Sequence, residues 1–154
     1  MPAWKLPPKA KVYEALSAVA DDRVHLVGDT AAEVTSSARD KTYRVEWSAD
    51  RRQFASNDNA SFWQGYTGYP IIAVLLKLGA LQAPARLLHH LAGIEWKKLN
   101  KQFKNDYDKA VDHVLSQLEE GEAAAIRASA NDIYEQVNGL HLERLASSLR
   151  PPKA

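Results

Sequence analysis

Residues 56–76 read SNDNASFWQGYTGYPIIAVLL, and this stretch joins two segments of different chemistry. Its first half mixes polar side chains, aromatic rings and glycines, whereas an unbroken apolar run follows Pro70. Proline is tolerated in the first turn of a helix, where the amide hydrogen that it lacks has no partner. We therefore expect a loop that leads into an apolar helix, opened by Pro70 and closed by Gly79.

Four short β-prone segments precede this loop. They are RVHLVG at 23–28, AAEVTSS at 31–37, KTYRVEWS at 41–48 and RQFAS at 52–56, and the residues between them are typical of turns. In the third segment Tyr43, Val45 and Trp47 fall on one face and polar residues on the other, which is the alternation of a half-buried strand. The four segments predict a small antiparallel meander.

Helical patterns flank this meander on both sides. KAKVYEALSAVA at 9–20 spaces its apolar residues as an amphipathic helix does, and residues 84–93 suggest a shorter helix or turn. A wide apolar stripe continues to Gly121, and the last segment carries a narrow seam of Ile126, Ala130, Ile133 and Val137, followed by Leu142, Leu145 and Leu149. The expected fold is α+β: an N-terminal helix, a meander packed on a helix, and a C-terminal helical region.

Composition limits the class of protein further. A length of 154 residues with 45% hydrophobic and 25% charged side chains fits a single domain over 1–154, made of an αββββα part at 8–80 and a helical extension at 83–149. The net charge of +1 makes no global demand for nucleic acid or a membrane. The chain has no cysteine, and its start, MPAWKLPPKAK, has no apolar core of signal-peptide length, so we expect a cytoplasmic protein without membrane contact.

The segments EVTSSARDKTYRVEW (33–47), ASNDNASF (55–62) and GYPIIAVLLKLG (68–79) together resemble SWIM-type zinc fingers over about residues 31–80. That family has two strands, a Cys-x-Cys pair, a loop, and Cys-x-His leading into an apolar helix. Laid over the pattern, the ligand positions fall near Ser56, Asp58, Gly68 and Pro70, which are not a plausible tetrahedral zinc set. The resemblance therefore implies a relative that binds no metal, and we expect no cofactor.

Without zinc, another interaction has to hold the loop to the helix. Phe62, Trp63, Tyr66 and Tyr69 are candidates, because each ring buries about 150–250 Å² when it is enclosed. The alternative is that the loop is a recognition surface. Its candidate binding residues are Asn57, Asp58, Asn59, Trp63, Gln64 and Tyr66.

A second candidate surface lies in EWKKLNKQFK at 95–104. Lys97, Lys101 and Lys104 are spaced i, i+4 and i+7, which predicts one helix face able to meet successive phosphates. Trp96 stands beside this row and offers a ring for stacking, although a core position is the alternative. A solvated charged face without a ligand also remains open.

The sequence favours a binding protein over an enzyme. It contains no glycine-rich phosphate loop, nucleophile elbow or metalloprotease helix, so an active site would need Asp58 to meet a distant histidine in the fold. SWIM-type domains are generally thought to engage nucleic acid or protein. The lysine row favours DNA or RNA, and the alternative is protein interaction or oligomerisation through the C-terminal helices, at the seam of Ile126, Ile133 and Val137.

Overall fold

A computed structural model describes residues 2–152. Its elements in chain order are α1 (Ala10–Ala20), β1 (Val24–Gly28), β2 (Ala31–Thr35), β3 (Thr42–Trp47), β4 (Gln53–Ser56), the π-helix η1 (Ala60–Gln64), α2 (Tyr69–Lys77), α3 (Ala85–Leu88), the 3-10 helix η2 (His89–Leu91), α4 (Trp96–Gln102), α5 (Tyr107–Leu115), α6 (Glu120–Leu140) and β5 (Glu143–Arg144). The α+β prediction, with a helix before the sheet and helices after it, is confirmed.

The sheet has the strand order β1-β2-β3-β4-β5. The first four strands form the predicted antiparallel meander, and β5 adds to β4 in parallel. Val45 of β3 lies opposite Ala32 of β2 and Ser56 of β4, and it is fully buried. Trp47 is buried on the same face and stacks on Phe54 with ring centroids 5.9 Å apart. The alternation of KTYRVEW therefore turns one face of the sheet toward the helices.

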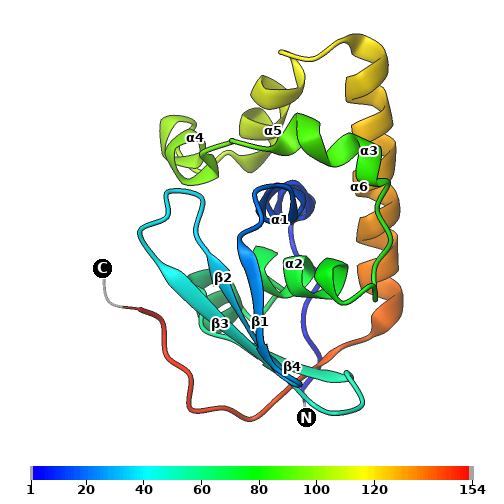
Figure 1. The fold of residues 1–154 in the computed structure, drawn as a ribbon. Coiled ribbons are helices and arrows are strands. Elements are labelled where there is room, and N and C mark those ends of the chain that lie inside the picture. The colour runs from blue at the N-terminus through cyan, green and yellow to red at the C-terminus, as the bar shows by residue number, and fades with distance from the viewer. Residues whose placement is uncertain (1, 153–154) are drawn as a thin grey trace.

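Helix α1 occupies the centre of the molecule (Figure 1). Its neighbours are α2, which packs against the sheet, and the later helices α3, α5 and α6. The sequence predicts an amphipathic helix with one apolar face, but every residue from Ala10 to Ala18 is buried. Because helices cover it on several sides, α1 also encloses three polar residues, Lys11, Glu14 and Ser17.

Helix α2 begins as the sequence predicts, with Pro70 in its first turn and Gly68 at its N-cap. Three of the positions where the resemblance places ligands, Ser56, Asp58 and Gly68, are joined here by hydrogen bonds through Ser61. Ser56 Oγ donates to Asp58 Oδ1 at 2.5 Å, and Asp58 Oδ2 accepts from the Ser61 amide at 3.0 Å. Ser61 Oγ in turn accepts from the Gly68 amide at 3.0 Å. A buried hydrogen-bond chain thus connects β4 to the start of α2.

This chain requires a close approach at Gly68, and replacement by alanine tests it. A Cβ at position 68 would overlap the side-chain oxygens of Asp58 and Ser61. We expect Gly68→Ala to lower the free energy of unfolding by about 1–3 kcal/mol in urea denaturation. Gly139→Ala is the matched control: it lies in α6 with open space around it, and we expect a gain of up to about 1 kcal/mol. Equal effects at the two positions would contradict the close approach.

The segment after Ile94 breaks where the sequence predicts a continuous helical stripe. Helix α4 ends at Gln102, and Lys104 and Asn105 follow with positive φ angles of 54° and 64°. Asp106 then caps α5 by accepting a hydrogen bond from the Lys109 amide at 3.2 Å. The prediction that Lys97, Lys101 and Lys104 share one helix face is therefore wrong, because Lys104 lies in the turn between two helices.

Helix α6 runs along one side of the molecule, where it contacts α1 and α3 (Figure 1). Ile126, Ala130, Ile133 and Val137 are all buried within this one chain. The prediction that this seam presents a surface to a partner or a second copy is wrong, since its side chains belong to the core. None of the helices within residues 2–152 is long and apolar enough to cross a bilayer.

Two segments close to the ends of the described chain, residues 3–5 and 142–145, meet beside β4. His141 ends α6 in the left-handed conformation, and the chain returns beneath the sheet (Figure 1). Trp4 donates from its amide to Leu142 O at 3.0 Å and from its indole to Phe54 O at 3.1 Å. The Leu145 amide also donates to Phe54 O, at 2.9 Å. The helical continuation of the leucine seam beyond 140 is thus replaced by a short strand and an extended tail.

Candidate functional site

A cavity of about 570 Å³ lies where α1, the β2–β3 connection, η1 and the α4–α5 region meet. Its volume is in the range of small-molecule and cofactor sites, about 300–1,000 Å³. The lining includes both surfaces that the sequence singles out, the aromatic loop after β4 and the lysine segment of α4. The fold therefore combines into one site two stretches that are far apart in the sequence.

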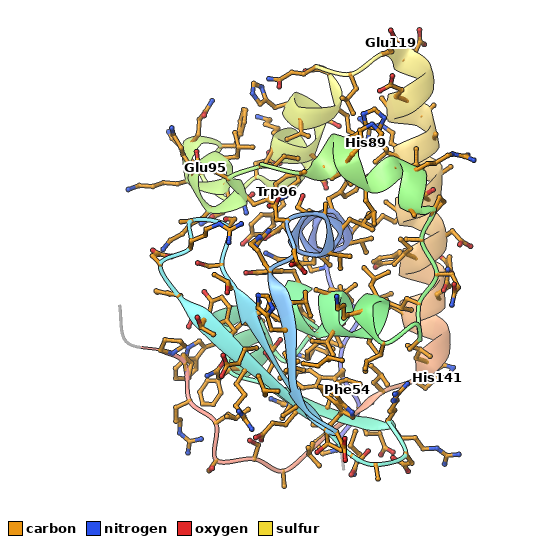
Figure 2. All side chains as sticks on the ribbon, in the orientation of Figure 1. Phe54, His89, Glu95, Trp96, Glu119 and His141 are labelled. Carbon is orange, nitrogen blue, oxygen red and sulfur yellow. The ribbon has the colours of Figure 1, made fainter. Side chains whose placement is uncertain are left out.

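Helix α4 is fixed over this cavity by two hydrogen bonds at its first turn. The Trp96 indole donates to Ser17 Oγ on α1 at 2.8 Å, and the Lys97 amide donates to Ser37 Oγ in the β2–β3 connection at 3.2 Å. Figure 2 shows Trp96 next to α1, pointing into the molecule. This anchoring sets the position of the lysines that follow in α4.

Six cationic side chains line the cavity against one carboxylate, Glu14. The cations are Lys11, Arg23, Lys41, Lys97, Lys101 and Lys104. Lys97 Nζ lies 3.0 Å from Asp40 Oδ2, and its hydrogen bond lowers the pKa of Asp40. Among residues 2–152, no carboxylate lies within ion-pair distance of Lys41, Lys101 or Lys104. The cavity therefore has a local excess of positive charge that the net charge of the chain does not reveal.

Lys11 and Glu14 form a buried ion pair on α1 at this cavity. Lys11 Nζ lies 3.2 Å from Glu14 Oε2, and both side chains are less than a tenth exposed. The same ammonium lies 4.2 Å from the centroid of the Tyr107 ring. Burial raises the pKa of Glu14, and the charge of Lys11 together with hydrogen bonds from Lys11 and Asn100 offsets only part of that effect.

Arg23 precedes β1 and is 1% exposed. Its Nη1 donates to Thr35 O at 2.8 Å, and its Nε donates to Asp21 Oδ2 at 3.3 Å. Its Nη2 is buried and has no hydrogen-bond partner among the described residues. A buried donor left unpaired costs about 1–3 kcal/mol, so this guanidinium is suited to receive an acceptor from outside the chain.

The aromatic lining comes from both sides of the cavity. Trp63 projects from η1 with 69% of its surface exposed, and its ring meets Phe62 edge to face at 4.7 Å. Tyr43 and Tyr69 pack edge to face with centroids 6.4 Å apart, and burial raises the pKa of each hydroxyl. The interpretation of Trp63 as a core residue that replaces a metal clip is wrong. Here the hydrogen bonds of Asp58 and Ser61 hold the loop, and the Trp63 ring is left free.

Most residues of the two predicted surfaces meet at the cavity. Those that line it are Asn59, Trp63, Gln64, Tyr66, Trp96, Lys97, Lys101 and Lys104. Trp96 is only 2% exposed and its indole is already hydrogen-bonded to α1, so it serves as a core anchor. The other seven side chains remain candidates for contact with a ligand.

Two predicted binding residues lie outside the cavity lining. Asn57 accepts from the Arg44 amide at 2.8 Å and donates to Arg150 O at 3.1 Å, which ties the loop to β3 and to the C-terminal tail. Asp58 is 4% exposed and belongs to the hydrogen-bond chain described above. Both are therefore structural residues, and Asp58 makes its hydrogen bonds with serines and not with a histidine.

The sequence analysis missed the floor of the cavity. Lys11 and Glu14 lie in the helix expected at 9–20, and Arg23 begins the segment at 23–28, but the sequence pattern assigns none of the three a role in binding. The available signal was the i, i+3 spacing of opposite charges in a helix otherwise rich in alanine and valine. Within the described part of the chain, no group of three or more His, Cys, Asp or Glu residues is placed to hold a metal ion.

This geometry defines an α+β protein with a cavity that is rich in cations and lined by aromatic side chains. The chain belongs to the family described as uncharacterised conserved protein UCP014422, whose model matches residues 4–143. No curated protein and no solved structure matches the chain. The family match covers every residue that lines the cavity.

The raised pKa of Glu14 makes stability depend on pH. The folded protein keeps the Glu14 proton at pH values where the unfolded chain has released it. The protonated Glu14 side chain therefore stabilises the fold fully below about pH 4.5, the ordinary pKa of this carboxyl group. The stabilisation is lost as the pH rises through the higher pKa that Glu14 has in the folded protein. Glu14→Gln cannot titrate, so we expect its free energy of unfolding to improve relative to wild type as the pH increases above 4.5.

Urea denaturation of both proteins at several pH values from about 4 to 8 measures this difference, because the linked proton appears in the pH dependence of stability. Glu33→Gln, at an exposed position of β2, is the matched control. A difference between Glu14→Gln and wild type that does not change with pH would contradict the assignment of a raised pKa to Glu14.

Proposed function

We propose that this protein binds single-stranded nucleic acid at the cavity. The observation that carries the proposal is the excess of cations around the cavity, with Lys41, Lys101 and Lys104 free of any ion pair among residues 2–152. Lysines that replace counterions on phosphates supply most of the affinity of sequence-independent binding. Lys41 lies in the β2–β3 connection, Lys101 in α4 and Lys104 in the turn after α4, so the three offer several contact points to one strand.

The aromatic and amide side chains favour a single strand over a duplex. Trp63 is mostly exposed and held from one side by Phe62, which leaves a ring face for a base. Stacking of this kind requires a base that is not already stacked in a duplex. Asn59 and Gln64 flank the same loop, and their amides can both donate to and accept from base edges. The resemblance to SWIM-type domains is compatible with nucleic acid or with protein as the partner and does not choose between them.

The contribution of the lysines is tested by charge removal. The variant with Gln at positions 97, 101 and 104 should retain the fold, because Lys97, Lys101 and Lys104 are all exposed and glutamine has a helix propensity similar to that of lysine. Three lost phosphate contacts should make the log–log salt slope for a single strand shallower by about 2. Fluorescence polarisation with a labelled oligonucleotide across a fourfold range of salt would show the wild type losing about 20-fold more affinity than the variant.

The matched control replaces Lys77, Lys98 and Lys109 by Gln, which removes the same charge from exposed positions outside the cavity lining. This control should keep the wild-type slope. A wild-type protein that binds neither single-stranded DNA nor RNA at low salt would refute the proposal. Equal salt slopes for the two triple variants would show that the lysines at the cavity do not contact the phosphates.

Trp63→Ala separates binding from stability. Because the indole is 69% exposed, we expect the free energy of unfolding to change by about 0.5 kcal/mol or less. Loss of one stacked base should weaken binding by about 5- to 150-fold. Leu26→Ala, an exposed apolar position on β1 outside the cavity lining, is the control for both measurements. A large loss of stability with unchanged affinity would show that Trp63 is a packing residue.

A further inference from the structure

The floor of the cavity carries a second set of charges that the rim lysines do not explain. Lys11 is 7% exposed and Arg23 is 1% exposed, yet both line the cavity. Exposed lysines such as Lys101 are sufficient to follow a strand along its phosphates. Each of them has one carboxylate partner, Glu14 for Lys11 and Asp21 for Arg23, but Nη2 of Arg23 has no partner among the described residues. A buried donor that lacks an acceptor is costly, so this nitrogen indicates a ligand group that reaches the floor.

The protein provides for these two cations unequally: burial lowers the pKa of Lys11, but Glu14 and two nearby tyrosines together more than offset that effect, whereas Arg23 keeps one nitrogen without a partner among the described residues. Glu14 is the one carboxylate that lines the cavity, and its partner is Lys11 at 3.2 Å. Burial raises the pKa of Glu14, so this carboxyl holds its negative charge less readily than an exposed one. Arg23 meets Asp21 only through Nε, at 3.3 Å, and keeps Nη2 without a partner among the described residues. An acceptor at the floor would give Nη2 of Arg23 its missing partner.

We propose that the cavity floor binds a phosphate monoester carried by a nucleotide, and that Lys11 and Arg23 neutralise it. The nucleotide is either a free mononucleotide or the phosphorylated end of a strand, and the second case rests on the proposed function. An internal phosphodiester carries one charge and continues as chain on both sides, whereas a monoester ends the chain and carries a charge of about −1.5 to −2 near pH 7. A terminal group with nearly two charges suits a cavity whose lining has six cations and one carboxylate.

The surroundings of the floor support this assignment. Tyr107 contacts the Lys11 ammonium through its ring, and Asn100 on α4 bonds to Glu14. Burial raises the pKa of Tyr66, a further lining residue, so its hydroxyl stays protonated and able to donate. The exposed ring of Trp63 lies on the lining of the same cavity, where a base attached to the phosphate can stack.

The test compares ligands that differ only in the phosphate. Oligonucleotides of one sequence with a 5′-phosphate, a 3′-phosphate or two hydroxyl ends are measured by fluorescence polarisation on the whole protein, and AMP and adenosine are measured as competitors. We expect a terminal phosphate to strengthen binding about tenfold or more, since hydrogen bonds to charged groups are the strong ones. AMP should compete and adenosine should not.

Variants assign the effect to the floor. Lys11→Gln should abolish the advantage of the phosphorylated end, whereas Lys101→Gln on the rim should weaken all strands alike. Glu14→Gln should increase the advantage, because it removes the one negative charge beside the phosphate, and damage to the fold would not produce such a gain. Lys98→Gln, on α4 but outside the cavity lining, is the matched control for all ligands.

The outcomes separate this inference from the proposed function. Equal affinity for phosphorylated and hydroxyl ends, with no competition by AMP, would overturn the monoester site and leave strand binding intact. Competition by AMP for a fluorescent mononucleotide, in a protein that binds no oligonucleotide, would overturn strand binding and support the site as one for free mononucleotides. Absence of binding to every ligand would overturn both.

Discussion

The enclosure of α1 is the constraint on which the rest of the structure depends. Every residue from Ala10 to Ala18 is buried between the layer of α2 and the sheet and the layer of later helices. Polar groups on such a helix have to be satisfied inside the molecule. Ser17 receives the indole of Trp96, which anchors α4, and Lys11 pairs with Glu14 at the cavity. The position of α4 and the charged floor are thus both consequences of packing around one helix.

The cavity also depends on an interruption of regular structure. A continuous helix from 94 to 120 would lead the chain straight past α1. Instead, Lys104 and Asn105 adopt positive φ, and Asp106 caps a new helix that turns back to pack on α1. Left-handed backbone is uncommon outside glycine, and asparagine is one of the residues that tolerates it. The turn brings Lys104 and Tyr107 to the same cavity as Lys97, although they no longer share a helix.

Much of the fold could be predicted because its signals are local. The alternation in KTYRVEW, the turns between strands and Pro70 at the start of a helix each act over a few residues. Which aromatic side chain turns inward could not be predicted in this way. For both Trp63 and Trp96, the sequence allowed either a core position or a surface position. The structure exposes the first and buries the second. That difference arises from the π-helical turn of η1 and from a partner, Ser17, that is distant in sequence.

Strand β4 receives hydrogen bonds from two segments that lie far apart in the chain. Trp4 and Leu145 donate to the same carbonyl oxygen, that of Phe54, from opposite ends of the described chain. Segments close to both ends of the described chain are thus held by one strand, and the residues after Leu145 continue to Arg150, whose carbonyl oxygen accepts a hydrogen bond from Asn57 at 3.1 Å. During synthesis the edge of the sheet at β4 therefore stays open until Glu143–Arg144 have left the ribosome, because β5 follows α6 in the chain.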